Sequence, residues 1–174
     1  MNLKNWIVVD VEADNTSPAT GSIVCFGAVS VADLSKVFYG KTKPITPEYN
    51  EKALAISGFT RAEHEKFPEP KVIFGGFDTW IHSIVGSDRA TLLSDNPAFD
   101  WQWINYYFDQ YFGYNPFGFS ARRIGDLYCG LVKDLRANRD WKRKYRKTAH
   151  DHNPVNDAKG NAEAILALVK EFNL

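Results

Sequence analysis

Long apolar runs are missing from this sequence, so we expect no membrane-spanning segment. The two longest, Trp6–Val11 and Ile23–Val31, are far shorter than the roughly 20 residues that cross a bilayer. Asp10 and Glu12 interrupt the apolar segment near the N-terminus, so a signal peptide is not predicted. The two cysteines lie in apolar surroundings without metal-ligand spacing, which indicates buried thiols in a reducing compartment. We therefore expect a cytoplasmic protein that does not bind membranes.

An excess of charge of either sign is also absent, because 21 Lys and Arg residues balance 21 Asp and Glu residues. A neutral chain has no overall field that attracts a polyanion, so any attraction for nucleic acid must come from a local patch. The segment Arg136–Lys147 is such a patch, since its basic residues are interleaved with aromatic ones. This pattern predicts either a contact with phosphates or an ordinary solvated helix end.

A chain of 174 residues is long enough to bury a sizeable core, and we predict one domain over residues 1–174. Short β-branched runs predict strands, and apolar residues at helical spacing predict helices. The expected strands cover residues 6–11, 22–31, 36–41 and 90–94, and the expected helices cover 50–56, 72–85, 99–112, 120–135 and the chain from 154 onward. This order predicts an α/β fold, in which an antiparallel meander continues into parallel strands and helices flank the mixed sheet.

Two acidic residues lie at the end of the first predicted strand. Asp10 and Glu12 are alternate strand residues, so their carboxylates face the same side. Bringing them close costs like-charge repulsion unless a cation neutralises it. A solvated strand end is the alternative reading of this pair taken alone.

Two further acidic residues and a histidine begin helices predicted later in the chain. Asp100 and Asp157 lie in first helical turns, where the helix dipole alone can explain an acid. His152 precedes the last helix, and the nearby His150 competes for any role assigned to it. Carboxylates that converge from distant segments suit two divalent cations such as Mg²⁺ or Mn²⁺. The two histidines with nearby carboxylates leave a zinc-dependent hydrolase as an alternative.

Taken in order, these residues form three short motifs. They are Asp10-Val11-Glu12, the segment Asn96–Asp100 with its Asn-x-x-Phe-Asp pattern, and His152–Ala158 with its His-x-x-x-x-Asp-Ala pattern. Over essentially its whole length the chain thereby resembles the DEDDh branch of the DnaQ-like 3′–5′ exonucleases, which have a ribonuclease H-like fold. It departs from the family pattern at Ala13, where Thr is usual, and at Asp95, where His is common. Neither departure removes a metal ligand.

The resemblance implies that nucleoside monophosphates are released from 3′ ends by hydrolysis with two metal ions. By this analogy Asp10, Glu12 and Asp157 hold the metal that activates water. Asp10 also contacts the second metal, Asp100 supports that metal, and neutral His152 accepts a proton, so activity should fall at acidic pH. Small stand-alone relatives such as oligoribonuclease and ribonuclease T process RNA, which favours RNA over DNA as the substrate.

The resemblance also bears on how substrate is held and on assembly. Small relatives are often homodimers, and the basic stretch at residues 136–147 could then lie beside the partner subunit's site. Asn96 could bind the terminal sugar or phosphate, and the departure at Ala13 bears on how the terminal nucleotide is held. The candidates for stacking on a base are Phe59, Phe99, Trp101 and Trp103, with core packing as the alternative for the tryptophans. Two other functions stay open, a DNA-directed exonuclease of the same family and a non-catalytic nucleic-acid-binding module, which would be expected to lack a carboxylate.

Overall fold

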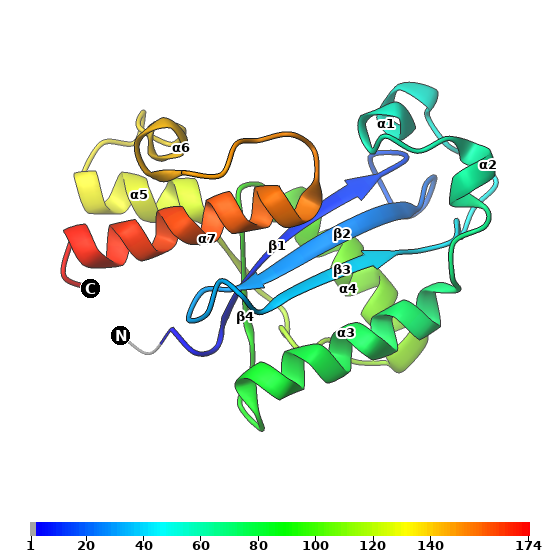
Figure 1. Cartoon of the computed structure of the whole chain (residues 1–174), viewed down its shortest axis with the longest axis horizontal. Coiled ribbons are helices and arrows are strands. Elements are labelled where there is room, and N and C mark those ends of the chain that lie inside the picture. The colour runs from blue at the N-terminus through cyan, green and yellow to red at the C-terminus, as the bar shows by residue number, and fades with distance from the viewer. Residues whose placement is uncertain (1–2) are drawn as a thin grey trace.

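A five-stranded mixed sheet organises the protein, which is described here over residues 3–174 from a computed structural model (Figure 1). The strand order is β3-β2-β1-β4-β5. β1 (Trp6–Ala13) pairs antiparallel with β2 (Ile23–Ser30), which pairs antiparallel with β3 (Val37–Lys41). β4 (Thr91–Ser94) runs parallel to β1, and β5 (Ala121–Arg123) runs parallel to β4. The predicted α/β fold with a meander and parallel strands is confirmed.

Helices cover both faces of this sheet. α3 (Pro70–Val85) and α4 (Pro97–Phe112) pack on one face, while α5 (Ile124–Val132), α6 (Asp140–Tyr145) and α7 (Pro154–Glu171) pack on the other (Figure 1). Two short helices, α1 (Glu51–Ile56) and α2 (Arg61–His64), follow β3 near the end of β1. Across residues 3–174, no helix combines the length and the apolarity that crossing a bilayer requires.

The alternation of β1 residues assigns each side chain to one of two cores. Ile7, Val9 and Val11 pack in the aromatic core under α3 and α4, whereas Trp6 and Val8 pack under α5–α7. Because alternate residues share a face, the even-numbered positions continue toward α7 as the strand leaves the core. The strand therefore presents its two acidic residues to the N-terminal end of α7.

Many of the aromatic side chains pack in the hydrophobic core. The rings of Phe26, Phe74 and Phe77 contact one another in tilted or edge-to-face geometry, and the Phe74 ring centroid lies 5.1 Å from that of Phe108. Trp103 and Tyr107 are fully buried in the same cluster. The two cysteines, Cys25 and Cys129, are buried free thiols, as the sequence predicts.

The prediction was wrong in one region. The expected helix over residues 120–135 begins instead with the short strand β5, and its helical part covers only Ile124–Val132. Lys133 ends that helix in the left-handed conformation, with φ of 57°. α6, within the basic stretch, was not predicted. Pairing with β4 creates β5, and a sequence pattern alone does not contain that contact.

α7 lies unusually close to β2. A Cβ atom on Gly27 would overlap the backbone atoms of Pro154 and Val155, so only glycine fits at this position. Asn153 caps α7 by accepting hydrogen bonds from the N–H groups of Val155 and Asn156, as the Asn-Pro pattern predicts. The contact sets the height of the first turn of α7 above the sheet.

Gly27→Val should push the N-terminus of α7 away from β2. Overpacking of a close contact typically costs about 1–3 kcal/mol, so we expect a loss of unfolding free energy in that range, measured by urea denaturation. Gly130→Ala is the matched control, because no described atom lies within 4 Å of the added Cβ and the residue is helical. An unchanged stability for Gly27→Val would contradict the close approach.

Candidate active site

Four carboxylates from three elements converge at the C-terminal end of β1. Single ligand oxygens of Asp10, Glu12 and Asp157 all lie within 4.8 Å of one another. Asp100, in the first turn of α4, is tied to the same strand, because its Oδ1 accepts a hydrogen bond from the backbone N–H of Val11 at 3.0 Å. The structure therefore brings together all four acidic residues that the sequence motifs single out.

The fold explains this convergence. β1 and β4 are parallel, so their C-terminal ends lie at the same edge of the sheet, where sites of open α/β folds gather. α4 begins just after β4, which places Asp100 beside β1, and Ser94 Oγ donates to Asp100 Oδ2 at 2.6 Å. α7 brings Asp157 from the opposite face through its contact with Gly27.

The charges of this cluster repel one another. Burial raises the pKa of Asp10 well above the usual range, and nearby carboxylates raise it further. Burial also raises the pKa of Glu12 to about 7, with a further contribution from Asp157. It likewise raises the pKa of Asp100 to about 7, although the hydrogen bonds that Asp100 accepts oppose the shift. A positive charge bound in this pocket would therefore stabilise the ionised form of these carboxylates.

The carboxylate of Asp157 has one oxygen that no hydrogen bond within the described chain satisfies. Asp157 Oδ2 is buried and accepts no hydrogen bond from any residue between 3 and 174. An unsatisfied buried carboxylate oxygen is costly unless an ion or water meets it. An all-oxygen ligand set of this kind suits Mg²⁺ or Mn²⁺.

Both histidines reach the cluster. His152 Nδ1 lies 3.6 Å from Glu12 Oε1, and His150 Nδ1 lies 2.6 Å from Asp157 Oδ2 without the alignment of a hydrogen bond. The two rings are in edge contact, with centroids 4.4 Å apart. Single ligand atoms of His150, His152 and Asp157 also lie within 4.8 Å of one another, which is the set that the zinc alternative requires.

The loop that carries His152 is ordered by its neighbours. His152 has a φ of 60°, a conformation that non-glycine residues rarely adopt. Asp151 accepts hydrogen bonds from the Asn153 N–H at 3.0 Å and from Asn156 Nδ2 at 2.8 Å, which fixes the chain on either side. The His152 side chain is half exposed, at 51%, so it faces an open site from a fixed backbone.

One of the predicted substrate contacts is wrong. Trp103 is fully buried in the α3–α4 core, where its ring cannot reach a nucleotide base. Phe99 is half-buried and packs edge-on against Trp103, and Ala13 is buried at the end of β1. Asn96 is exposed, and within the described chain its side chain makes no capping hydrogen bond to α4. Phe99 and Asn96 therefore stay accessible candidates.

A cavity of about 260 Å³ opens beside His152, with Phe59, Tyr39 and Cys25 in its lining. Lys41 adds positive charge here, because its Nζ lies 5.2 Å from the Phe59 ring centroid and 5.9 Å from that of Tyr39. The sequence analysis names Phe59 as a candidate for stacking, but neither Tyr39 nor Lys41. Tyr39 lines the cavity from β3, and Lys41, at the end of the same strand, contacts the rings of Phe59 and Tyr39.

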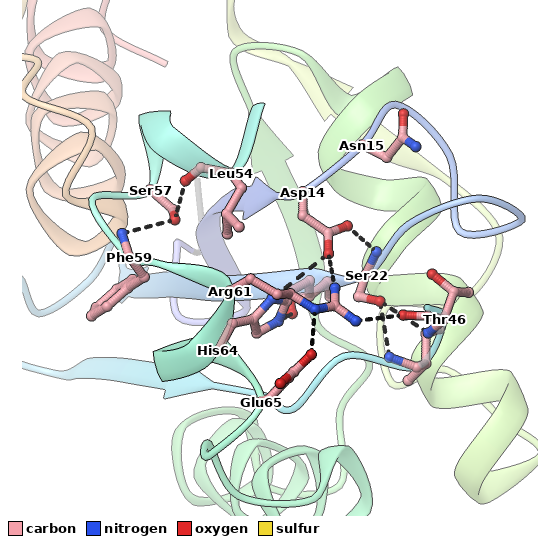
Figure 2. A network of polar contacts seen from close by, with 12 residues as sticks. Asp14, Asn15, Ser22, Thr46, Leu54, Ser57, Phe59, Arg61, His64 and Glu65 are labelled. Carbon is pink, nitrogen blue, oxygen red and sulfur yellow. Dashed lines mark hydrogen bonds and ion pairs between the residues drawn. The ribbon is translucent and has the colours of Figure 1, made fainter. Parts of the chain in front are cut away.

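A buried polar network holds the segment that carries Phe59 (Figure 2). Asp14 is buried after β1 and accepts from the Ser22 N–H at 2.5 Å and from Arg61 Nη1 at 3.2 Å. Arg61 also donates to the Thr46 carbonyl at 2.9 Å, which joins α2 to the loop before α1. Burial raises the pKa of Asp14 to about 6, although Arg61 and the Ser22 N–H favour the charged form.

The comparisons with known proteins agree with this geometry. A family model described as a 3′-5′ exoribonuclease Rv2179c-like domain matches residues 5–169. The chain belongs to this family. It is also 32% identical over 171 residues to the 3′-5′ DNA exonuclease Cap18 of Escherichia coli, covering 95% of this chain and 91% of Cap18.

Solved structures support the same fold. The nuclease domain of 3′hExo, a DEDDh family member bound to rAMP, has a TM-score of 0.73 at 17% identity, covering 95% of this chain and 92% of that domain. Cell-death related nuclease 4 also has a TM-score of 0.73, at 11% identity, and this chain spans 64% of its length. The predicted ribonuclease H-like fold and the predicted 3′–5′ exonuclease class are confirmed.

Asp10→Asn should stabilise the protein when a chelator removes divalent cations. Burial, with repulsion as a smaller cause, raises the pKa of Glu12 and of Asp100 to about 7, whereas unfolded carboxyls titrate near 4, so the cost of the charged carboxylates in the folded state grows as the pH rises from about 4 to about 7. Removing one charge at pH 8 should raise the unfolding free energy by about 1–3 kcal/mol, and the gain should vanish at pH 4.

Urea denaturation at both pH values measures this difference. Asp109→Asn is the control, because Asp109 is exposed at the other end of α4. A gain for Asp10→Asn that does not depend on pH would argue against repulsion as its cause.

Proposed function

We propose that this protein releases nucleoside monophosphates from the 3′ end of a nucleic-acid strand, using two divalent cations, Mg²⁺ or Mn²⁺. The observation that carries this proposal is the convergence of the Asp10, Glu12 and Asp157 oxygens within 4.8 Å, beside the buried Asp100. Bound there, such cations would neutralise the carboxylates and stabilise charge that develops on the phosphate and on the leaving 3′-oxygen.

The surroundings of each carboxylate indicate whether it would bind a cation directly or through water. Asp10, Glu12 and Asp157 would hold one cation, and Asp10 would share the second. Both oxygens of Asp100 already accept hydrogen bonds, at 3.0 Å from Val11 N–H and 2.6 Å from Ser94 Oγ. This supports a role for Asp100 through water, because its orientation is fixed and its lone pairs are partly used.

A histidine would accept the proton of the attacking water. His152 lies on a fixed, exposed loop at the edge of the site, and its imidazole is close to Glu12. In the neutral form it can take a proton and pass it to solvent, so activity should fall as acid protonates the ring. Its place at the start of the third motif favours it over His150.

The terminal nucleotide would lie between the carboxylates and the cavity beside His152. A base could stack on Phe59 in the cavity lining or on Phe99 of α4. Such stacking typically contributes about 1–3 kcal/mol of binding free energy per base. The exposed amide of Asn96 could bind the terminal sugar or phosphate, and Ala13 would leave room at the end of β1 because its side chain is small.

RNA is the substrate we propose, supported by the description of the matching family as exoribonucleases. DNA is the second candidate, because the similar protein Cap18 is a DNA exonuclease. A non-catalytic module has less support, since all four carboxylates are present and lie together. The predicted cytoplasmic location and homodimer stay predictions.

Incubation with 5′-labelled RNA and DNA oligomers of one sequence tests the activity. With Mg²⁺ we expect stepwise shortening from the 3′ end with mononucleotide products, faster on RNA, and no cleavage with a chelator. Asp157→Ala and Asp100→Asn should reduce the rate at least ~10³-fold, as loss of a charge-stabilising group can do, while Asp109→Asn should not. Equal turnover by Asp157→Ala would refute the assigned ligands, and faster shortening of DNA would reverse the substrate preference.

Single-turnover rates of two histidine variants identify the base. His152→Ala should lower the rate by about 10²–10⁴-fold and flatten its decline toward acidic pH, because general base catalysis contributes in that range. His150→Ala should change the rate by less than about 5-fold, well below that contribution. His82→Ala, on the exposed surface of α3, controls for loss of a histidine. The opposite ranking of the two variants would assign the base to His150.

A further inference from the structure

The basic stretch at residues 136–147 makes several of its contacts within its own chain. Lys142 forms an ion pair with Asp95, Lys144 with Glu171, and Arg146 with Asp157. Two of these pairs involve segments of the candidate active site. Lys142 and Arg146 are therefore engaged within their own chain, and the expected place of the stretch beside a partner subunit's site stays a prediction.

The pair between Arg146 and Asp157 is the most buried of the three. Arg146 Nη2 donates to Asp157 Oδ1 at 2.9 Å, and the two side chains are only 10% and 1% exposed. The remaining oxygen, Oδ2, is the buried atom that accepts no hydrogen bond from residues 3–174. One oxygen of the carboxylate is thus held by the guanidinium, and the other, which lies 2.6 Å from His150 Nδ1, belongs to the cluster of candidate ligand atoms.

The protein leaves space on α7 for this guanidinium. A Cβ atom on Gly160 would lie 2.6 Å from Arg146 Nε and 2.8 Å from Nη2, so any larger residue would displace the arginine. Gly160 follows Asp157 by three residues, on the same face of the helix. Asp157 and the space for its partner therefore come from one helical turn.

The segment that presents Arg146 is itself fixed to α7. Glu163 accepts hydrogen bonds from the N–H groups of Lys147 and Thr148, at 2.9 and 2.8 Å, and from Thr148 Oγ1 at 3.0 Å. Three bonds to one carboxylate immobilise the chain directly after Arg146. A second contact reaches the other side of the site, because Lys142 pairs with Asp95, which lies between β4 and α4.

We propose that Arg146 is a positioning residue that orients Asp157 for cation binding, with α6 and the segment after it as its support. The inference rests on the proposed function. A residue that hydrogen-bonds a ligating carboxylate fixes the orientation of that ligand, and its loss typically weakens metal affinity about 10–100-fold. The alternative is purely electrostatic. In that case Arg146 repels cations, and removing its charge would strengthen Mg²⁺ binding.

The opposite signs of these two effects allow a decisive test. The melting temperature of the full chain is measured against Mg²⁺ concentration for the wild type, Arg146→Met and Arg146→Lys. We expect the midpoint to rise about 10–100-fold in Arg146→Met, the usual effect of losing a residue that orients a metal ligand, and by less in Arg146→Lys. Lys71→Met is the matched control, because it removes one positive charge from an exposed position on α3, outside the support of Arg146, and should leave the midpoint unchanged.

Chemical rescue distinguishes positioning from a merely structural role. In Arg146→Ala, millimolar guanidinium should lower the Mg²⁺ midpoint toward the wild-type value, and it should not affect the wild type. An unchanged or lower midpoint in Arg146→Met would overturn the proposal, as would failure of guanidinium to restore Mg²⁺ binding in a folded Arg146→Ala. A rise in KM for the oligomer alone would also overturn it, since Arg146 would then bind substrate phosphate.

The melting experiment needs no substrate, so it separates this inference from the proposed function. A wild type that binds Mg²⁺ but cleaves no oligomer would contradict the nuclease proposal and leave the Arg146 test intact. If the melting temperature of the wild type does not change with Mg²⁺ concentration, the positioning role itself is overturned.

Discussion

Repulsion among carboxylates at the end of β1 is the constraint on which the rest of this structure depends. Asp10 and Glu12 share one face of the strand, and Asp100 and Asp157 approach from helices on either side. Folding brings together charges that would separate in water, so neighbouring elements must oppose the repulsion. The hydrogen bonds to Asp100 and the Arg146 guanidinium do this within the protein, and what remains unneutralised is available to a cation.

The sheet can carry this acidic cluster because the apolar residues that stabilise the sheet lie outside the site. The apolar residues of β1 alternate between two cores, and the aromatic cluster around Phe74 and Phe77 lies on the face away from α7. Burial of that cluster contributes stability that the acidic edge does not. The strained functional edge and the well-packed core are thereby separated in space, which is a common compromise between stability and activity.

Much of this could be predicted from local sequence. The apolar run before Asp10 predicts β1, the spacing at Thr60 predicts the capping box that α2 has, and Asn153 before proline predicts the start of α7. Each of these signals involves only a few neighbouring residues, so it can be recognised without knowledge of the fold. The order of the motifs also indicated the family, because each acidic residue lies at the end of an element and such ends meet at one edge of the sheet.

The remainder depended on contacts between distant segments. β5 exists through pairing with β4, and Trp103 is core because α4 packs on the sheet, although its neighbour Phe99 is partly accessible. The register of β3 against β2 places Lys41 opposite Cys25, near the Phe59 ring that lines the cavity. Likewise, nothing in the sequence around Arg146 indicates that its partner is Asp157, because that ion pair requires α6 and α7 to be packed together. Two glycines, at 27 and 160, admit α7 and Arg146 at distances that a methyl group would prevent. Divergent relatives with a bulkier residue at position 27 should therefore have a wider gap between α7 and β2, and those with a bulkier residue at position 160 should have no room for a guanidinium beside the carboxylate of the third motif.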